Sequence, residues 1–223
     1  MSGIKDTVKI YGNSKIGEGT KIMDYTIIGM VSRKNTGNGS IIGRNCTIRN
    51  HNCIYEDAAV GDDFQSGGLT QIREGVRIGN NCKVGTLCTI EIGAVIGNHV
   101  NIQGHCNIGE WSKIEDGVFV GPMVIMATDF KMDGNIRPAT IKSGVRIGSN
   151  STIVGGVTIG EGAIIGAHSV VTTDIPPFTI ACGIPARPVK KVTEEEVARF
   201  QKNMIKDKVD IVGLYRNMVS VQK

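Results

Sequence analysis

Residues 71–120 read QIREGVRIGNNCKVGTLCTIEIGAVIGNHVNIQGHCNIGEWSKIEDGVFV, with an aliphatic residue at every sixth position from Ile72 to Val120. A glycine often follows the aliphatic residue, as at Gly79, and a small residue often stands four places after it, as at Cys82. A period of six fits neither an α-helix nor the simple alternation of a β-strand. It is the spacing of a hexapeptide solenoid, in which each repeat is one short strand followed by a corner.

The same period extends over most of the chain in three further runs. The aliphatic positions of these runs are Ile4, Ile10, Ile16, Ile22 and Ile28; Ile42, Ile48, Ile54 and Val60; and Ile141, Ile147, Ile153, Ile159, Ile165 and Val171. One repeat cannot bury its apolar face alone, so the repeats are stable only as a stack. Glycine, asparagine and aspartate suit the corners, because a positive φ costs them little. We therefore predict an all-β solenoid.

This pattern resembles that of the hexapeptide-repeat acyltransferases. The resemblance covers residues 1–190 and implies a left-handed parallel β-helix, in which three repeats make one coil; the handedness follows from the resemblance alone. About 25 repeats make about eight coils, and coils are spaced like neighbouring strands, about 4.8 Å apart. The resemblance also implies a homotrimer with its active sites in the clefts between neighbouring prisms.

The composition agrees with a narrow prism filled by Ile and Val. The 223 residues include 30 glycines and only 4% aromatic residues. A net charge of +4 is too small to indicate a nucleic-acid partner, and no apolar run is long enough to cross a membrane. The first residues, MSGIKDTVKI, already follow the repeat and lack the features of a signal peptide. We therefore expect a cytoplasmic protein.

The six cysteines do not form a metal-binding or disulfide pattern. The small inward position of a repeat is occupied by Cys46, Cys82, Cys88 and Cys106. We expect these four to pack as small apolar side chains. Cys53 and Cys182 have no CxxC partner, so we predict no metal.

Three segments interrupt the repeat, and function in a solenoid concentrates at interruptions. The first, residues 29–40, shifts the phase, while the second, residues 62–68, keeps the phase but places Ser66 at an aliphatic position. The third, residues 127–140, leaves the repeat after Met126, and its polar sequence predicts a surface loop. In the family such a loop often reaches over the acceptor site or a neighbouring subunit. The alternative is an insertion without function, because long loops cost little stability.

Residues 153–191, IVGGVTIGEGAIIGAHSVVTTDIPPFTIACGIPARPVKK, resemble the closing coils of acetyl-coenzyme-A-dependent members. The resemblance implies that the pantetheine arm of the coenzyme lies beside these coils. The backbone groups expected to face it are those of Gly155, Gly156 and Ala167. The cations expected near its phosphates, which bind Arg and Lys, are Arg187, Lys190 and Lys191. The alternative for the two lysines is a solvated surface pair.

The hexapeptide pattern ends near Val192, and residues 191–223 are predicted to form a helical segment. Thr193 and Glu196 make a capping box, which predicts a helix from Glu194 to about Lys206. A second helix is expected around Tyr215. Its apolar stripe would pack on the prism or on another subunit.

Three stretches resemble the nucleotide-linked amino-sugar N-acetyltransferases, namely residues 71–82, 102–107 and 114–122. The resemblance implies transfer of an acetyl group from acetyl-coenzyme A to a 3-amino sugar carried on UDP or dTDP. The residues that it carries over as substrate-binding groups are Arg73, Glu74, Gln103 and Asp129. Two departures leave the sugar unidentified: His105 stands where many relatives have Asn, and the third interruption lacks their Asn-Asp pair.

Each of the four histidines follows an aliphatic position by three places, which predicts an exposed corner: His51, His99, His105 and His168. His105 stacks below Met123, in the repeat that leads to the third interruption, and is therefore our candidate general base. His51 is the second choice. The alternative for His105 is a corner residue without a catalytic role. His99 and His105 fall on successive corners and cannot share one metal.

An imidazole titrates near 6.5 in model peptides, so it can accept the proton that an attacking amine or hydroxyl releases. His105 is thus compatible with N- and with O-acetylation, and a sugar O-acetyltransferase stays an alternative. No cysteine has an evident activating partner, so direct attack of the acceptor on the thioester is the simpler mechanism. Two other classes stay open: a metalloenzyme like the γ-class carbonic anhydrases, which needs three converging histidines on zinc, and a non-catalytic scaffold.

Overall fold

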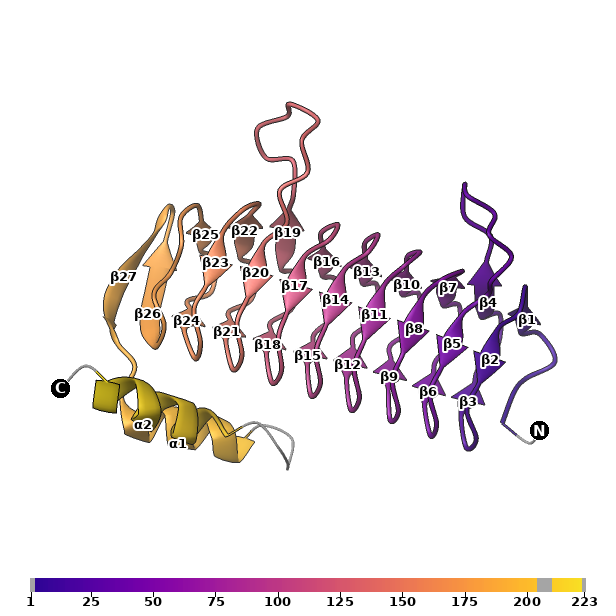
Figure 1. Ribbon diagram of the computed structural model, residues 1–223, viewed down its shortest axis with the longest axis horizontal. Coiled ribbons are helices and arrows are strands. Elements are labelled where there is room, and N and C mark those ends of the chain that lie inside the picture. Colours follow the sequence, from indigo (N-terminus) through magenta and orange to yellow (C-terminus); the bar gives the residue numbers. More distant parts are fainter. Residues whose placement is uncertain (1–2, 204–209, 222–223) are drawn as a thin grey trace.

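The computed structural model describes residues 3–203 and 210–221, which form a three-sided parallel β-helix followed by two short helices (Figure 1). The predicted all-β solenoid is confirmed. The chain visits three sheets in turn, so the described residues have three rows of corners, named here corner 1/2, corner 2/3 and corner 3/1 after the sheets that they join.

Sheet 1 contains β1 (Lys9–Ile10), β4 (Ile27–Met30), β7 (Cys53–Tyr55), β10 (Gln71–Ile72), β13 (Thr89–Ile90), β16 (Asn107–Ile108), β19 (Ile125–Ala127), β22 (Thr152–Val154) and β25 (Val170–Val171). Sheet 2 contains β2 (Lys15–Ile16), β5 (Ile41–Ile42), β8 (Ala59–Val60), β11 (Arg77–Ile78), β14 (Val95–Ile96), β17 (Lys113–Ile114), β20 (Thr140–Ile141) and β23 (Thr158–Ile159). Sheet 3 contains β3 (Lys21–Ile22), β6 (Thr47–Ile48), β9 (Gln65–Ser66), β12 (Lys83–Val84), β15 (Asn101–Ile102), β18 (Phe119–Val120), β21 (Arg146–Ile147), β24 (Ile164–Ile165), β26 (Thr179–Gly183) and β27 (Ala186–Lys191).

The register of the strands follows directly from the period of six. Gln71 pairs with Thr89, and Ile72 pairs with Ile90, so residues 18 apart stack in neighbouring coils. The second residue of each two-residue strand points inward: Ile72 is 1% exposed and Ile90 is fully buried. The four cysteines predicted to face inward are 0–2% exposed, as expected. The exceptions are Ile10, which is 44% exposed, and Ile16, which is partly exposed, because both lie in the first coil, at the end of the stack.

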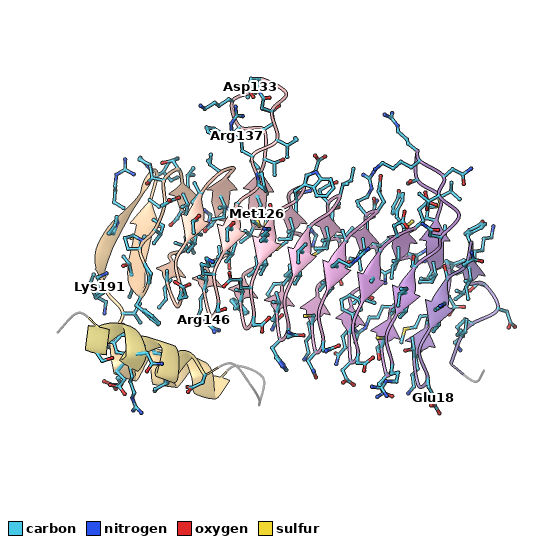
Figure 2. The ribbon with its side chains drawn as sticks, in the orientation of Figure 1. Glu18, Met126, Asp133, Arg137, Arg146 and Lys191 are labelled. Carbon is cyan, nitrogen blue, oxygen red and sulfur yellow. The ribbon has the colours of Figure 1, made fainter. Side chains whose placement is uncertain are left out.

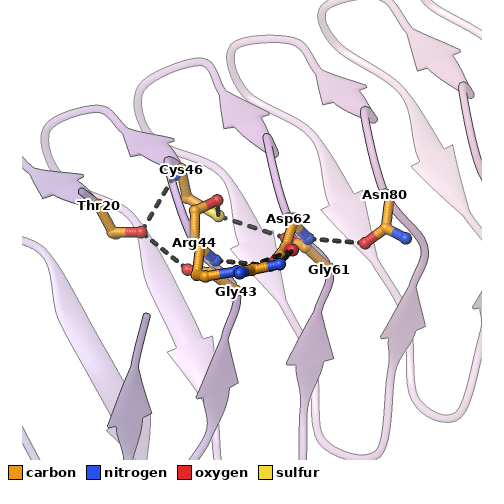
Figure 3. A network of polar contacts seen from close by, with 7 residues as sticks. All are labelled: Thr20, Gly43, Arg44, Cys46, Gly61, Asp62 and Asn80. Atoms are coloured by element: carbon orange, nitrogen blue, oxygen red, sulfur yellow. Dashed lines mark hydrogen bonds and ion pairs between the residues drawn. The ribbon is translucent and has the colours of Figure 1, made fainter. Parts of the chain in front are cut away.

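Corner 2/3 is built from asparagine and aspartate side chains that bridge successive coils (Figure 3). Asp62 Oδ1 accepts the backbone N–H of Arg44 at 2.7 Å, and Asn80 Oδ1 accepts that of Asp62 at 2.8 Å. Asn98 and Asp116 continue the ladder at 2.9 and 2.6 Å. Each bond satisfies a corner amide that has no place in a strand, so the ladder joins the coils where their sheets bend.

Two loops project from corner 1/2, and Figure 1 shows both on the same side of the prism. The first joins β4 to β5 and is held by Glu56, which is only 1% exposed. The Glu56 carboxylate accepts hydrogen bonds from the Ser32 hydroxyl, the Thr36 hydroxyl and the Gly37 N–H. These bonds, led by that of Ser32, lower the pKa of Glu56 to about 2, so the anchor of this loop is a carboxylate at neutral pH.

The second loop joins β19 to β20 and is the predicted surface loop of residues 127–140. The second interruption, by contrast, forms no loop, because β9 keeps its place in sheet 3. Its buried Ser66 accepts a hydrogen bond from Asn52 Nδ2 at 2.9 Å inside the prism.

The C-terminal end of sheet 3 is closed by a hairpin, in which β27 runs antiparallel to β26. The helices α1 (Glu194–Asn203) and α2 (Ile211–Val221) follow, and Val197 packs against Phe178 beside the last coils. The capping box is confirmed, since Thr193 N–H donates to Glu196 Oε2 at 2.9 Å and Glu196 N–H donates to Thr193 Oγ1 at 3.2 Å. The expected helix end at Lys206 lies outside the described residues. Within the described part of the chain, no helix is long and apolar enough to cross a membrane.

Candidate active site

His105 lies on corner 3/1, between β15 and β16, with a φ of 61°. Its backbone N–H donates to the Thr86 carbonyl at 2.8 Å, which stacks it one coil above Leu87, and Met123 stacks one coil further on. Leu87 and Met123 are 47% and 56% exposed. The imidazole is exposed and makes no hydrogen bond to any described residue. It is therefore free to accept a proton from a ligand.

The other histidines are engaged or covered. The ring of His51 stacks on that of Tyr25, with the ring centroids 5.0 Å apart. His168 Nδ1 lies 2.9 Å from Asn150 Nδ2. His99 lies on corner 2/3 and is only half-exposed, so the prediction of an exposed histidine was wrong there; its Nδ1 is buried without a partner among the described residues.

Arg73 and Glu74, predicted to bind substrate, lie together on corner 1/2. Arg73 Nε donates to Glu74 Oε2 at 2.9 Å, Arg73 Nη1 lies 3.6 Å from Glu91 Oε2, and the guanidinium stacks 4.9 Å from the Tyr55 ring centre. Burial, the largest single influence, raises the pKa of Glu74, but the hydrogen bond from Arg73, a backbone hydrogen bond and the charge of Arg73 together outweigh it, so the pKa is lowered. The cluster is thus a satisfied ion pair with a second carboxylate beside it.

Asp129 lies in the loop between β19 and β20, and its carboxylate serves the loop itself. It accepts hydrogen bonds from the N–H groups of Asp133 and Gly134 at 3.1 and 2.9 Å. Asp133 also pairs with Arg137 at 2.7 Å, and Figure 2 shows these two side chains facing each other at the tip of the loop. The loop is therefore braced internally, and only part of the Asp129 carboxylate is left for a ligand.

The base of the same loop packs on Gly155 and Gly156, two of the predicted coenzyme-facing residues. The N–H of Gly156 donates to the Arg137 carbonyl at 3.0 Å. A Cβ at Gly155 would collide with the carbonyls of Ala127, Thr128 and Arg137, so only glycine fits there. Ala167, the third predicted residue, lies instead on corner 3/1, beside His168.

The three predicted phosphate-binding cations all lie on β27 or at its end. Lys190 Nζ is paired with Glu196 Oε1 at 2.8 Å, and this bond is the main cause that lowers the pKa of Glu196 to about 2. Lys191 Nζ donates to Thr179 Oγ1 at 3.2 Å, and Arg187 Nη1 donates to the Ala186 carbonyl at 3.0 Å. Arg187 and Lys191 have no carboxylate partner in the part of the chain that is described.

The predicted site residues therefore fall into separate groups. Gln103 joins His105 and Ala167 on corner 3/1, and its Nε2 donates to Asn101 Oδ1 at 2.8 Å. Arg73, Glu74, Gly155 and Gly156 lie on corner 1/2. The two rows border opposite edges of sheet 1, so no single point of one prism touches both.

The described residues offer no cluster that could hold a metal ion, and the buried Cys82 thiol is poorly suited to nucleophilic chemistry. Nowhere among them do three or more His, Cys, Asp or Glu side chains gather in a way that could hold a metal ion. Burial raises the pKa of the Cys82 thiol to about 11, so this side chain is a poor nucleophile at neutral pH.

Comparison with known proteins agrees with the architecture. The family model described as "Bacterial transferase hexapeptide (six repeats)" matches residues 138–173. The bifunctional protein GlmU of Thermotoga petrophila is 31% identical over 86% of this chain and 38% of its own length. The galactoside O-acetyltransferase of Escherichia coli is 36% identical over 40% of this chain and 49% of its own length. The chain thus spans less than half the length of these curated relatives.

The crystal structure of the UDP-N-acetylglucosamine acyltransferase of Francisella novicida superposes with a TM-score of 0.73. It covers 88% of this chain and 72% of its own, at 21% sequence identity, so the likeness concerns the fold. The coil, the repeat and these comparisons agree: the chain carries the transferase hexapeptide repeat, has the fold of a left-handed parallel β-helix, and resembles the hexapeptide-repeat acyltransferases.

Proposed function

We propose that the chain transfers an acetyl group from acetyl-coenzyme A to the amino group of a nucleotide-linked amino sugar. The observation that carries the proposal is the state of His105: an exposed imidazole, free of hydrogen bonds to the described residues, on a corner of a prism that resembles those of this family. The acceptor class is supported by the resemblance of residues 71–82, 102–107 and 114–122 to the nucleotide-linked amino-sugar N-acetyltransferases.

The reaction is a direct transfer. The amino nitrogen attacks the thioester carbonyl carbon, the new C–N bond forms, and the C–S bond breaks. His105 accepts the proton that the nitrogen loses, and the departing coenzyme sulfur takes up a proton to become the thiol. The reaction needs no metal and no covalent enzyme intermediate.

Acetyl-coenzyme A is the co-substrate, and the last coils suit it in charge. Arg187 and Lys191, which no carboxylate of the described residues neutralises, can meet its phosphates. Lys190 would have to break its ion pair with Glu196 before it could bind a phosphate. The N–H of Gly156 is already used by the loop, so Gly155 and Gly156 would act by keeping the surface beside the coenzyme free of side chains.

The acting unit is proposed to be a homotrimer with His105 in the cleft between neighbouring prisms. Corner 3/1 carries a ridge of exposed large side chains at the positive-φ position, formed by Tyr25, Leu69, Leu87 and Met123. Such residues are disfavoured there, and exposed apolar rows mark contact surfaces. Burial of the ridge by further copies would place His105, which lies within it, at the interface.

Transfer to a sugar hydroxyl is the second candidate. The galactoside O-acetyltransferase relative favours it, since that protein is 36% identical over 40% of this chain. The same histidine could deprotonate a hydroxyl, so the acceptor has to be found by assay.

The test is a panel of UDP- and dTDP-linked amino sugars, each paired with its hydroxy counterpart, assayed with acetyl-coenzyme A by release of the free thiol. We expect turnover of an amino sugar. His105→Ala should lower kcat about 10- to 1,000-fold, abolish the limb of the pH–rate profile that reports the base, and leave coenzyme affinity unchanged. His168→Ala, an exposed histidine at the equivalent corner position, is the matched control.

A His105→Ala variant with the kcat and pH profile of the wild type would remove the base from the mechanism. Turnover of hydroxy sugars alone would favour the second candidate. A chain whose melting temperature does not rise with acetyl-coenzyme A would be a scaffold, because a ligand that binds the native state must stabilise it.

A further inference from the structure

The outer face of sheet 3 carries an open groove of about 360 Å³ that has no part in the mechanism above. It crosses three neighbouring strands, β9, β12 and β15, and reaches Arg49, which follows β6 in the preceding coil. Three spacings of about 4.8 Å make it about 14 Å long. The polar side chains along it are Arg49, Gln65, Lys83, Thr86, Asn101 and Gln103. The groove is thus lined by polar side chains and is long enough for a ligand of a few chemical groups.

The second interruption of the repeat explains why a groove lies here. Ser66 replaces an aliphatic residue and is turned into the prism, where Asn52 Nδ2 donates to its hydroxyl at 2.9 Å. Gly67 follows, and a Cβ there would collide with the backbone of Gly85 and Thr86. Ser66 and Gly67 thus place no bulky side chain on the outer face of sheet 3, and the surface is recessed there.

The charges of the groove are all of one sign. Arg49 and Lys83 are its charged lining residues, and neither lies within ion-pair distance of a described carboxylate. Arg49 is also oriented, because its Nη1 donates to the Ser66 carbonyl at 3.0 Å. Two cations without counter-ions, one of them held in place, favour an anionic ligand, and guanidinium and ammonium groups suit phosphate oxygens.

The groove ends at the turn that carries His105. Thr86 lines the groove and accepts the backbone N–H of His105 at 2.8 Å, and Gln103 stands two residues before His105. The Gln103 side chain is fixed by Asn101, so its Nε2 is directed along the face of sheet 3. A ligand that lies on Arg49 and Lys83 therefore has its next group beside the proposed base.

We propose that this groove binds the diphosphate of the nucleotide-linked acceptor, with Arg49 and Lys83 as the phosphate-binding residues. The inference rests on the proposed function, since it supplies the subsite for the acceptor of that reaction. It also divides the ligands of the prism: the acceptor diphosphate lies on sheet 3, and the coenzyme phosphates lie at β27. Both ligands carry phosphates, so the experiment has to separate them.

The experiment measures binding without turnover, by calorimetric titration of the full chain with UDP, dTDP and coenzyme A in separate runs. Arg49→Gln and Lys83→Gln should each weaken UDP or dTDP binding about 10-fold, and the double variant about 100-fold, as expected for charge-assisted hydrogen bonds. Coenzyme A affinity should not change. Lys113→Gln is the matched control, because Lys113 is exposed and starts β17 of sheet 2 as Lys83 starts β12.

Unchanged nucleotide affinity in the double variant, with an unchanged melting temperature, would overturn the proposal. So would a loss of coenzyme A affinity in place of nucleotide affinity, or a wild-type chain that binds neither UDP nor dTDP. The proposed function is tested separately. UDP binding that depends on Arg49 and Lys83, without acetylation of any amino sugar, would support the groove proposal and contradict the proposed reaction.

Discussion

Corners 2/3 and 3/1 solve the same geometric problem with opposite chemistry. Both turn the chain through a residue of positive φ in every coil, with φ near 56° at Asn81 and at Leu87 alike. Corner 2/3 uses residues that accept this conformation, and the neighbouring Asn80 and Asp62 tie coil to coil. Corner 3/1 places Leu69, Leu87 and Met123 in the same conformation and leaves them about half exposed.

The difference supports the proposal that corner 2/3 faces solvent and that corner 3/1 forms a contact between copies of the chain. A left-handed conformation costs an ordinary residue about 1–2 kcal/mol, and Asn and Asp tolerate it best. In a lone prism, the apolar residues of corner 3/1 carry that cost and also meet water. Burial against another copy of the chain removes apolar surface from water, at about 25 cal/mol per Å², and offsets the cost.

The largest effect is expected on assembly. Leu69→Asp combined with Met123→Asp places charges in the proposed contact and should weaken the trimer about 1,000-fold or more, because a buried unpaired charge is costly. Sedimentation across a dilution series measures the change. Asn45→Asp with Asn81→Asp, at the equivalent positions of corner 2/3, should leave assembly unchanged. A wild-type chain that is monomeric at micromolar concentration would end the cleft model.

A smaller effect is expected from breaking the hydrogen-bond ladder of asparagine and aspartate side chains on corner 2/3. Asn80→Ala removes the acceptor of the Asp62 N–H and should lower the free energy of unfolding by about 1 kcal/mol. Thr86→Ala changes the equivalent residue of corner 3/1 and should have less effect. Urea unfolding measures the free energy of unfolding of both variants. Equal decreases would show that the two corners are held in the same way.

The smallest effect is expected from exchanging the turn residues themselves. Leu87→Asn should stabilise the dissociated chain by about 0.5 kcal/mol, while Asn81→Leu should destabilise it by about 1 kcal/mol, because only the first exchange relieves an unfavourable positive φ. The measurement is urea unfolding in the background of the two assembly substitutions. Shifts of the same sign would contradict the account of corner 3/1.

The repeat predicted most of the fold because period six leaves few choices. The inward Ile72, the buried Cys82 and the loop after Met126 all follow from counting positions, and all are confirmed. The capping box at Thr193 was equally readable, since its partners are local in sequence.

The site was harder to predict, because similarity along the chain says nothing about which corner a residue occupies. Arg73 and His105 came from neighbouring stretches of one resemblance, yet they border opposite edges of sheet 1. The internal bonds of Asp129 depend on how its loop folds, which no period determines. Arg49 was missed, although a comparison of residues at multiples of 18 would have placed it in one column with Gln103.

Because residues 18 apart stack, the residue number determines the position of a residue around and along the prism. Between the two loops, from β5 to β19, the remainder on division of a residue number by 18 sets its angle around the axis, and the quotient sets its height. Across the loops, paired residues are 26 or 27 apart, so the count restarts there. Removal of a whole coil from a regular stretch would shorten the prism and leave every later residue on its face. Removal of a single repeat would turn everything beyond it by roughly 120°, one third of a turn. His105 would then move from the ridge to another corner although its local sequence is unchanged. The position of a residue in this fold therefore depends on the number of residues before it as well as on its sequence neighbours.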